Sequence, residues 1–312
     1  MTLPGVEELA RAGELLRGGG LVAFPTETVY GLGANALDPA AVRRIFEAKG
    51  RPETNPLIVH VGSIEMAKPL VKEWPEAAAK LAARWWPGPL SIVLPKRDHV
   101  PDLVTAGLPG VALRMPSHPL ALALIRAAGV PLAAPSANRF AQLSPTTADH
   151  VRQGMGERVD MILDGGACQV GIESTVLSLM SQPPTLLRPG MVTREQLEKT
   201  LSNVQLHTSS EGAQPSPGLH PRHYCPRTSL VLIRGEEDLP QGRGALVGFR
   251  QMPAVKFVQM PDDPYEYAAV LYATLHQLDA LDLDWIAVER PPDSETWSAI
   301  VDRLQRAACR LE

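Results

Sequence analysis

Leu21-Val22-Ala23-Phe24 is the stretch that decides the fold: four apolar residues that follow Gly18-Gly19-Gly20 and precede the polar segment Pro25-Thr26-Glu27-Thr28-Val29-Tyr30-Gly31. A short apolar run between glycines and polar residues is typical of a buried strand. Residues 6–17 before it have the apolar spacing of a helix. The first part of the chain therefore reads as helix, strand and polar loop, which predicts an α/β domain.

A second helix is marked by its own start and stop signals. Asp38 can accept hydrogen bonds from free backbone N–H groups, and Pro39 fits the first helical turn. Gly50 suits the left-handed position that follows a helix. Lys49 and Arg51 therefore stand at the C-terminal end of this helix, where the helix dipole favours cations.

The rest of the chain mixes strands and helices without strict alternation. Strands are expected at 57–61, 90–94, 111–114, 131–134, 160–163, 175–179 and 185–188, and helices at 63–72, 76–86, 117–128, 145–153 and 193–201. This mixture predicts a twisted mixed sheet with flanking helices over residues 1–201. Residues 202–228 are rich in Ser, Gly, Pro and His and predict a linker. Strands at 229–233, 245–249, 255–259 and 284–289, with helices at 264–280 and 294–309, predict a smaller α/β, Rossmann-like domain over residues 229–312.

Composition limits the function classes. Apolar residues make up 45% and charged residues 21% of the 312 residues, as in globular proteins. Residues 1–200 carry 20 Lys and Arg against 19 Asp and Glu, which allows a basic pocket but no broad basic face, so direct tRNA binding is expected to be weak or absent. The 3 cysteines are far apart, so neither a zinc site nor a disulfide framework is expected. No apolar run reaches membrane-spanning length, so we expect a cytoplasmic protein without a membrane partner.

Four segments place cations beside small hydroxyl and amide side chains. They are Lys49-Gly50-Arg51, Arg114, Pro135-Ser136-Ala137-Asn138 and Arg188-Pro189-Gly190. If these segments converge, they form a cationic cleft suited to a nucleoside triphosphate and a small anion. A phosphate-loop motif is absent from the sequence, which excludes a P-loop NTPase on motif grounds.

Each of these segments also has a structural interpretation. Lys49 and Arg51 can form a solvated helix end, and residues 135–138 can form an ordinary turn. Arg114 can pair with a structural carboxylate instead of an anionic ligand. A histidine inside an apolar strand, such as His60, is more often a core residue than a ligand contact.

The loop 25–31 and the glycines after it allow several interpretations. The loop can recognise a small hydroxy amino acid, Glu27 can hold a metal ion, or the segment can be a polar turn closed by glycine. Gly31-Leu32-Gly33-Ala34-Asn35-Ala36 imitates a dinucleotide fingerprint, but the glycines lie too far beyond the strand for that motif.

The same segments resemble the L-threonylcarbamoyladenylate synthases, whose catalytic unit is the YrdC domain. The resemblance is carried by residues 25–33, Lys49-Gly50-Arg51-Pro52, residues 55–60, Trp86-Pro87-Gly88-Pro89, Arg114-Met115-Pro116, Pro135-Ser136-Ala137-Asn138, Glu173-Ser174-Thr175 and Arg188-Pro189-Gly190. It covers residues 5–200 in order. Ser216-Pro217-Gly218, His223-Tyr224 and the second domain resemble the longer, two-domain form of these enzymes.

The resemblance implies a reaction in which L-threonine, bicarbonate and ATP give threonylcarbamoyl-adenylate and pyrophosphate. A separate transferase would use the product to modify an adenosine beside the tRNA anticodon. The expected ATP-binding residues are Arg51, Asn55, Ser136, Asn138, Ser144, Arg188 and Tyr224, the last reaching back from the linker. The expected threonine-binding residues are Thr28, His60, Arg114, Ala134 and Ser174.

The chemistry implied by this resemblance needs charge and position more than a protein nucleophile. Lys49 and Arg51 are the expected catalytic residues, because cations offset the repulsion among three anionic substrates. Mg²⁺ is expected on the ATP phosphates without assigned protein ligands. No general base is assigned, although Glu27 is a candidate.

Two other functions stay open at this point. Related domains process carbamoyl-adenylate for transfer to another acceptor, and a basic concavity can bind double-stranded RNA. We also consider the hypothesis that the linker, with Pro217, Pro221 and Pro226, closes over the cleft as a lid that shields a labile carbamate from water.

Overall fold

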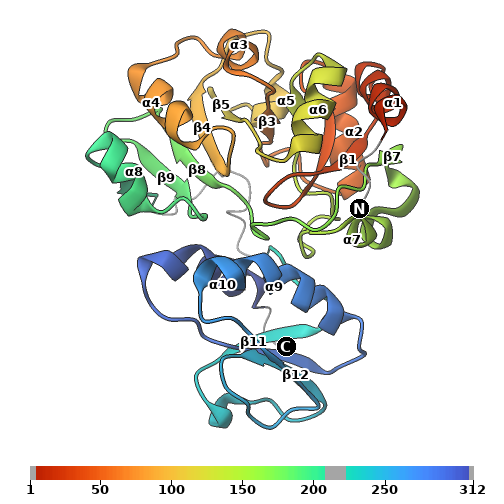
Figure 1. The fold of residues 1–312 in the computed structure, drawn as a ribbon, viewed down its shortest axis with the longest axis vertical. Coiled ribbons are helices and arrows are strands. Elements are labelled where there is room, and N and C mark those ends of the chain that lie inside the picture. The colour runs from red at the N-terminus through yellow and green to blue at the C-terminus, as the bar shows by residue number, and fades with distance from the viewer. Residues whose placement is uncertain (1–4, 208–222, 309–312) are drawn as a thin grey trace.

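The computed structural model describes residues 5–207 and 223–308. Within these ranges the chain forms two α/β units, a larger one that contains a ten-stranded mixed sheet and a smaller one that contains a four-stranded parallel sheet (Figure 1). This confirms the predicted fold class. Residues 208–222, which include Pro217 and Pro221 of the predicted lid, lie outside the described ranges.

The large sheet has the strand order β10-β9-β8-β4-β5-β3-β6-β2-β1-β7. Its strands are β1 (Val22–Pro25), β2 (Tyr30–Asn35), β3 (Ile58–His60), β4 (Leu90–Pro95), β5 (Gly110–Arg114), β6 (Leu132–Ala133), β7 (Met161–Ile162), β8 (Thr175–Ser178), β9 (Thr185–Arg188) and β10 (Gln205–Leu206). The helices of this unit are α1 (Val6–Arg17), α2 (Pro39–Lys49), α3 (Ile64–Ala67), η1 (Lys68–Leu70), α4 (Glu76–Trp85), α5 (Asp102–Thr105), α6 (Pro119–Ala128), α7 (Ala148–Met155), η2 (Gly156–Arg158) and α8 (Arg194–Leu201).

The polar loop after β1 is shorter than the sequence suggested. Val22 pairs with Gly33 and Pro25 pairs with Tyr30, so β1 and β2 form an antiparallel hairpin. A Cβ at Gly33 would lie 2.8 Å from the Phe24 ring, so only glycine fits there without displacing the ring. The glycines that imitate a dinucleotide fingerprint are therefore residues of β2, and this strand was missed because Gly31 and Gly33 lower its strand propensity.

Helix α2 confirms the predicted start and stop signals. The Asp38 carboxylate accepts a hydrogen bond from the Ala40 N–H, and Gly50 has a φ of 63°. Three other helical segments differ from expectation. The predicted helix 145–153 begins at Ala148, because Thr147 accepts the capping hydrogen bond from the His150 N–H. The segment 63–72 divides into α3 and η1, and the segment 294–309 divides into η4 (Glu295–Trp297) and α10 (Ser298–Ala307).

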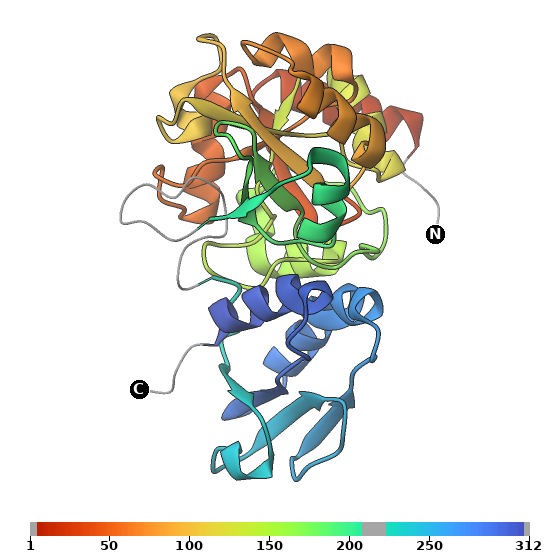
Figure 2. The ribbon, with the colours of Figure 1, turned by 90° about the vertical axis from the view of Figure 1, so that its left-hand side faces the viewer.

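The smaller unit contains β11 (Ser229–Ile233), η3 (Glu236–Asp238), β12 (Gly244–Gly248), β13 (Lys256–Gln259), α9 (Pro264–Asp279), β14 (Trp285–Glu289), η4 and α10. Its parallel strands have the order β11-β14-β12-β13. In both views, α9 and α10 lie between this sheet and the larger unit (Figures 1 and 2). These two helices therefore form the contact surface of the smaller unit.

The two units pack closely. Ile172, Leu143 and Met191 of the larger unit belong to one buried apolar cluster with residues of α9 and α10. Gly171 has a φ of +79°, and a Cβ there would lie 2.2 Å from the Ala268 carbonyl oxygen of α9. The backbones thus meet at Gly171 without a side chain between them. The predicted domain boundaries at 201/202 and 228/229 stay predictions.

Among residues 5–207 and 223–308, we find no helix with the length and apolar character that a membrane crossing requires.

Candidate functional site

A small cavity of about 50 Å³ is lined by residues of the large sheet and of the segments that flank it. Its lining residues are Thr26, Thr28, Val29, Gly31, Arg51, Ile58, His60, Arg114, Ala134, Pro135, Ser136, Glu173, Ser174, Arg188, His223 and Tyr224. The cavity therefore brings together nine of the residues predicted to bind substrates or to act in catalysis.

Strand directions explain why distant residues meet here. His60, Arg114 and Arg188 are the last residues of β3, β5 and β9. The pairing of β3 with β5 is parallel, and His60 is the register partner of Arg114. Strands β5 and β9 also run in the same direction, because β4 is antiparallel to β5, parallel to β8, and β8 is antiparallel to β9. The carboxyl ends of three strands thus point their last side chains toward one region.

Arg114 is held by a carboxylate of the chain itself. Its Nη2 lies 2.8 Å from Glu27 Oε1, and the two side chains are only 4% and 5% exposed. Its Nε also donates a hydrogen bond to the Gly88 carbonyl over 3.3 Å. The structural carboxylate considered for Arg114 is therefore present: Glu27 is the buried counter-ion of this cavity-lining arginine.

His60 is neutral and has an unused ring nitrogen. Burial, reinforced by the charge of Arg114, lowers the pKa of His60 to about 3. Its Nδ1 is buried without a hydrogen-bond partner, and its ring meets Phe24 edge to face at 6.2 Å. An unpartnered polar atom at a cavity wall indicates a place for a polar ligand atom. His60 is thus both a buried residue and a lining residue, so the two interpretations of this histidine are compatible.

Two threonines shape the neighbouring wall. Thr26 Oγ1 lies 2.8 Å from Thr28 Oγ1 and donates a hydrogen bond to the Val29 carbonyl over 2.6 Å. The Thr28 hydroxyl can therefore donate to Thr26 or turn to a ligand. The loop 25–31 is accordingly a hydrogen-bonded turn that also presents a hydroxyl to the cavity.

Arg51 and Arg188 bring two more cations to the cavity. Arg51 Nη2 donates to the Pro56 carbonyl over 3.1 Å, and burial lowers the pKa of Arg51 to about 10, with a smaller contribution from Arg188. Arg188 Nε donates to the Ser174 carbonyl over 3.0 Å, and Arg188 Nη2 donates to Ser174 Oγ over 3.1 Å. Burial also lowers the pKa of Arg188. The side chains of both arginines are thus fixed beside the cavity by oxygen atoms of the protein.

Lys49 lies behind the cavity wall. Lys49 is 2% exposed, and its ammonium donates to the Ser136 carbonyl over 2.6 Å and to the Asn138 carbonyl. Burial, followed by the charge of Arg51, lowers the pKa of Lys49 well below its ordinary value. This lysine therefore fixes the loop 135–138, and its catalytic role stays a prediction.

Three other predicted ATP-binding residues do not line the cavity. The Asn138 side-chain amide donates to the Arg139 and Gln142 carbonyls over 2.8 and 2.9 Å. Ser144 Oγ donates to Glu173 Oε1 over 2.6 Å. Asn55 is 8% exposed, and its carbonyl accepts from Arg51 Nε over 3.4 Å. Asn55 and Ser144 thus contact the lining residues Arg51 and Glu173, and the nucleotide contacts of all three residues stay predictions.

Tyr224 reaches the cavity from the end of the predicted linker, as expected. It is fully buried, with a φ of 64°, and its hydroxyl has no hydrogen-bond partner. Burial raises the pKa of this phenol to about 12. Its neighbour His223 also lines the cavity, and burial lowers the pKa of His223 well below its ordinary value, with Arg51 the next cause. The end of the predicted linker and the larger unit therefore both contribute residues to this cavity.

Sequence reasoning missed the roles of Glu173, Tyr272 and Arg303. Glu173 lies in a motif of the family resemblance that carries no predicted function for it, and the structure places it at the cavity wall. Arg303 of α10 and Tyr272 of α9 both contact Glu173 from the smaller unit. A single arginine in an amphipathic helix carries no sequence signal that separates it from a surface residue.

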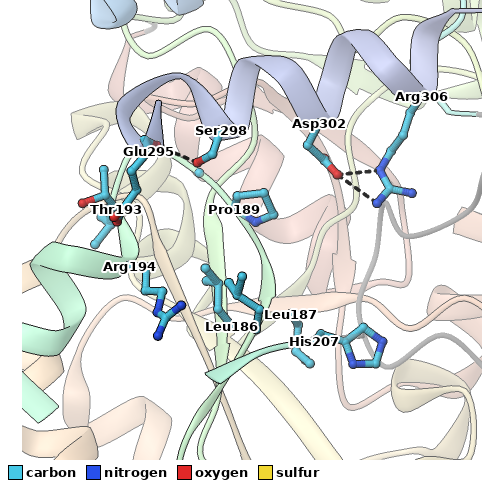
Figure 3. A pocket seen from close by; sticks show the side chains of 13 residues that line it. Leu186, Leu187, Pro189, Thr193, Arg194, His207, Glu295, Ser298, Asp302 and Arg306 are labelled. Carbon is cyan, nitrogen blue, oxygen red and sulfur yellow. Dashed lines mark hydrogen bonds and ion pairs between the residues drawn. The ribbon is translucent and has the colours of Figure 1, made fainter. Parts of the chain in front are cut away.

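The structure also has a larger cavity, of about 670 Å³, between β9, α8 and α10 (Figure 3). Its floor includes Leu186 and Leu187, and none of the predicted site residues lines it. The charge of its Arg306 is matched by Asp302 at 2.9 Å. Because the smaller cavity gathers the buried arginines, we assign the candidate active site to the smaller one.

Comparisons with known proteins agree on both units. Residues 14–190 match the family model described as Telomere recombination, which covers Sua5, YciO and YrdC proteins. Residues 192–309 match the model described as Threonylcarbamoyl-AMP synthase, C-terminal domain.

Full-length relatives carry the same description. The chain is 42% identical over 315 residues to a threonylcarbamoyl-AMP synthase of Pyrococcus abyssi, which covers 95% of this chain and 93% of the relative. It is 44% identical over 321 residues to that of Bacillus subtilis, with 96% and 93% covered. The crystal structure of P. abyssi Sua5 complexed with L-threonine superposes with a TM-score of 0.91 at 40% identity, and the alignment covers 97% of this chain and 94% of that one.

Proposed function

The chain belongs to the threonylcarbamoyl-AMP synthase family, and we propose that it converts L-threonine, bicarbonate and ATP into threonylcarbamoyl-AMP and pyrophosphate. The observation that carries this proposal is the convergence of Arg51, Arg114 and Arg188 on one cavity. Three substrates with negative charge must meet for this reaction, and fixed cations reduce their mutual repulsion.

The threonine side of the cavity is formed by Thr28, His60, Arg114, Ala134 and Ser174. The guanidinium of Arg114 is fixed by Glu27 and can bind a carboxylate with its remaining N–H groups. The unpartnered Nδ1 of His60 can pair with the hydroxyl or the amine of the substrate. The binding of L-threonine to a related protein supports this assignment.

The phosphate side is formed by Arg51, Ser136, Arg188 and Tyr224. The two arginines carry fixed positive charge, and the Ser136 backbone is tied to Lys49. ATP would enter as its magnesium complex, with Mg²⁺ held by phosphate oxygens and water. Among the described residues, no group of three or more His, Cys, Asp or Glu side chains is arranged to hold a metal ion.

The proposed reaction has two steps. The threonine amine attacks the carbon of bicarbonate, and loss of water gives a carbamate. A carbamate oxygen then attacks the α-phosphorus of ATP, and pyrophosphate leaves with the electron pair of the broken P–O bond. Arg51 and Arg188 would stabilise the charge that develops on the phosphoryl oxygens, and Arg114 would keep the threonine carboxylate away from the reacting carbon.

A separate transferase would then consume the product to modify an adenosine beside the tRNA anticodon. We place this step in the cytoplasm and expect little direct tRNA binding, because the larger unit has a small basic cavity instead of a broad basic face. Carbamoyl transfer to another acceptor and binding of double-stranded RNA remain the competing functions.

Pyrophosphate release from ATP separates these functions. We expect release only when both L-threonine and bicarbonate are present, with serine and alanine as control amino acids. Release that is unchanged without threonine would contradict the synthase. Strong, salt-sensitive binding to plain duplex RNA, without pyrophosphate release, would support the RNA-binding alternative.

A further inference from the structure

Arg303 of α10 reaches from the smaller unit to Glu173, a lining residue of the candidate active site. It is 1% exposed and is among the largest fully buried side chains of the described residues. Its Nε donates to Glu173 Oε2 over 2.7 Å, and its Nη2 donates to the Pro189 carbonyl over 3.0 Å. Its Nη1 lies 2.6 Å from Asp302 Oδ2. One guanidinium thus binds the residues directly before Ser174 and directly after Arg188.

Glu173 collects hydrogen bonds from both units. Ser144 Oγ donates to Oε1 over 2.6 Å, and the Tyr272 hydroxyl of α9 donates to Oε2 over 3.2 Å. Burial alone would raise the pKa of Glu173, but Arg303, Arg188 and Ser144 outweigh burial and lower the pKa. The lowered pKa favours the ionised carboxylate, and Arg303 of the smaller unit is the largest cause that lowers it.

The contacts continue from Arg303 into the cavity. Glu173 adjoins Ser174 in the chain, and Ser174 accepts two hydrogen bonds from Arg188. The Arg303 guanidinium also lies 5.4 Å from the centre of the Tyr224 ring, within the range of a cation–π contact. Figure 3 shows Asp302 and Arg306 on α10, which lies above Pro189 in this view. Arg303 of this helix thus contacts Tyr224 and the chain neighbours of Ser174 and Arg188.

We propose that Arg303 is a positioning residue, through which the smaller unit fixes Glu173-Ser174 and Arg188-Pro189 in the geometry that binds threonine and ATP. This inference rests on the proposed function. A buried ion pair is a poor source of stability compared with apolar packing, so its place across the two units is better explained by the geometry it imposes. The smaller unit thereby completes the active site.

The proposal predicts a change in substrate affinity, not only in the amount of folded enzyme. Arg303→Met keeps a flexible, unbranched apolar stem but is shorter than arginine and removes the charge and the donors. We expect the KM for threonine and the KM for ATP to rise at least tenfold. A purely structural role would lower the active fraction and leave both KM values unchanged. Arg303→Lys should recover part of the affinity, because an ammonium can still pair with Glu173 but cannot also reach Pro189.

A milder variant covers the case in which Arg303→Met does not fold. Tyr272→Phe removes only the hydroxyl that donates to Glu173 and leaves the charge of the site unchanged. We expect a threefold to tenfold rise in the KM for threonine with a melting temperature close to that of the wild type. The matched control is Arg250→Met, which removes another arginine of the smaller unit that pairs with Glu289 at 2.8 Å. It should leave both KM values unchanged.

The experiment is steady-state pyrophosphate release by the full chain, with threonine and ATP varied in turn, together with urea unfolding of each variant. If the wild type shows no threonine-dependent release, the proposed function is wrong and this inference is wrong with it. If the wild type does show it, but Arg303→Met and Tyr272→Phe keep both KM values within twofold, only the positioning role is overturned.

Discussion

Gly190→Ala is expected to damage the active site without removing any side chain from it. Gly190 follows Arg188-Pro189, and a Cβ at this position would lie 2.3 Å from the Thr175 backbone nitrogen and 2.8 Å from the Ser174 carbonyl carbon. A third neighbour is Thr175 Oγ1 at 2.6 Å, but the two backbone atoms cannot be relieved by the movement of a side chain. The methyl group therefore pushes directly on the residue predicted to bind threonine.

The size of the displacement follows from the geometry. Ordinary van der Waals contact begins at 3.4 Å, so the 2.3 Å approach requires a shift of about 1.1 Å. The segment cannot simply swing outward, because Thr175 Oγ1 donates to the Val192 carbonyl over 2.8 Å and accepts from the Val192 N–H over 3.2 Å. A misplacement of about 1 Å in a catalytic site can cost about 100-fold in rate.

The assay is pyrophosphate release at varied threonine, with Gly154→Ala as the matched control. A Cβ at Gly154 meets nothing within 4 Å, so the control should keep wild-type kinetics. We expect kcat/KM for threonine to fall by about 100-fold in Gly190→Ala, while the variant still unfolds cooperatively in urea. A kcat/KM within threefold of the wild type would refute the claim that Ser174 and Arg188 form a rigid substrate wall.

Three further predictions concern Arg51, the Glu27–Arg114 ion pair and His60. Arg51→Ala should lower kcat/KM for ATP by about 100-fold or more, because a fixed cation at the phosphates is lost. The control Arg43→Ala, which removes an exposed arginine that pairs with Glu53, should leave kcat/KM unchanged. Equal effects in the two variants would place the phosphates elsewhere. Glu27→Gln should lower the free energy of unfolding by about 3 kcal/mol, because it leaves Arg114 buried beside a neutral amide, and an unchanged urea midpoint would show that the pair is not buried in solution. The free energy of unfolding should fall as pH decreases below 6.5, by up to about 1.4 kcal/mol per pH unit from His60. The pKa of His60 is lowered to about 3 in the folded protein, so the unfolded chain binds more protons in that pH range. His60→Asn should therefore flatten the pH dependence of urea unfolding between pH 6.5 and 4.

Much of the fold was predictable because its signals are local. As expected, Asp38 caps the start of α2 and Gly50 follows its last residue. Strand β2 was not predictable, since glycines at positions 31 and 33 weaken a strand by themselves. They are tolerated because the Phe24 ring of the paired strand occupies the space above Gly33. That information is tertiary and does not appear in the pattern of the segment.

The candidate site also has a part that the sequence predicts and a part that it does not. Arg51, Arg114 and Arg188 were selected because cations at strand and helix ends suit anions, and the structure brings all three to one cavity. Lys49 was expected at the site on the same grounds, yet its ammonium faces the carbonyls of residues 136 and 138. Sequence spacing indicates which end of an element carries a residue, but not which oxygen atoms its side chain reaches. The contact of Arg303 with Glu173 is the hardest to predict, because the two residues are 130 positions apart in the chain.

The most direct test of the central claim is the fate of the bicarbonate carbon. The full-length protein is incubated with ATP, L-threonine and ¹³C-bicarbonate, and the nucleotide products are separated at once and analysed by mass spectrometry. We expect an adenylate that contains both threonine and one ¹³C atom, formed in equal amount to pyrophosphate. Pyrophosphate release with an adenylate that lacks either the label or threonine would contradict it.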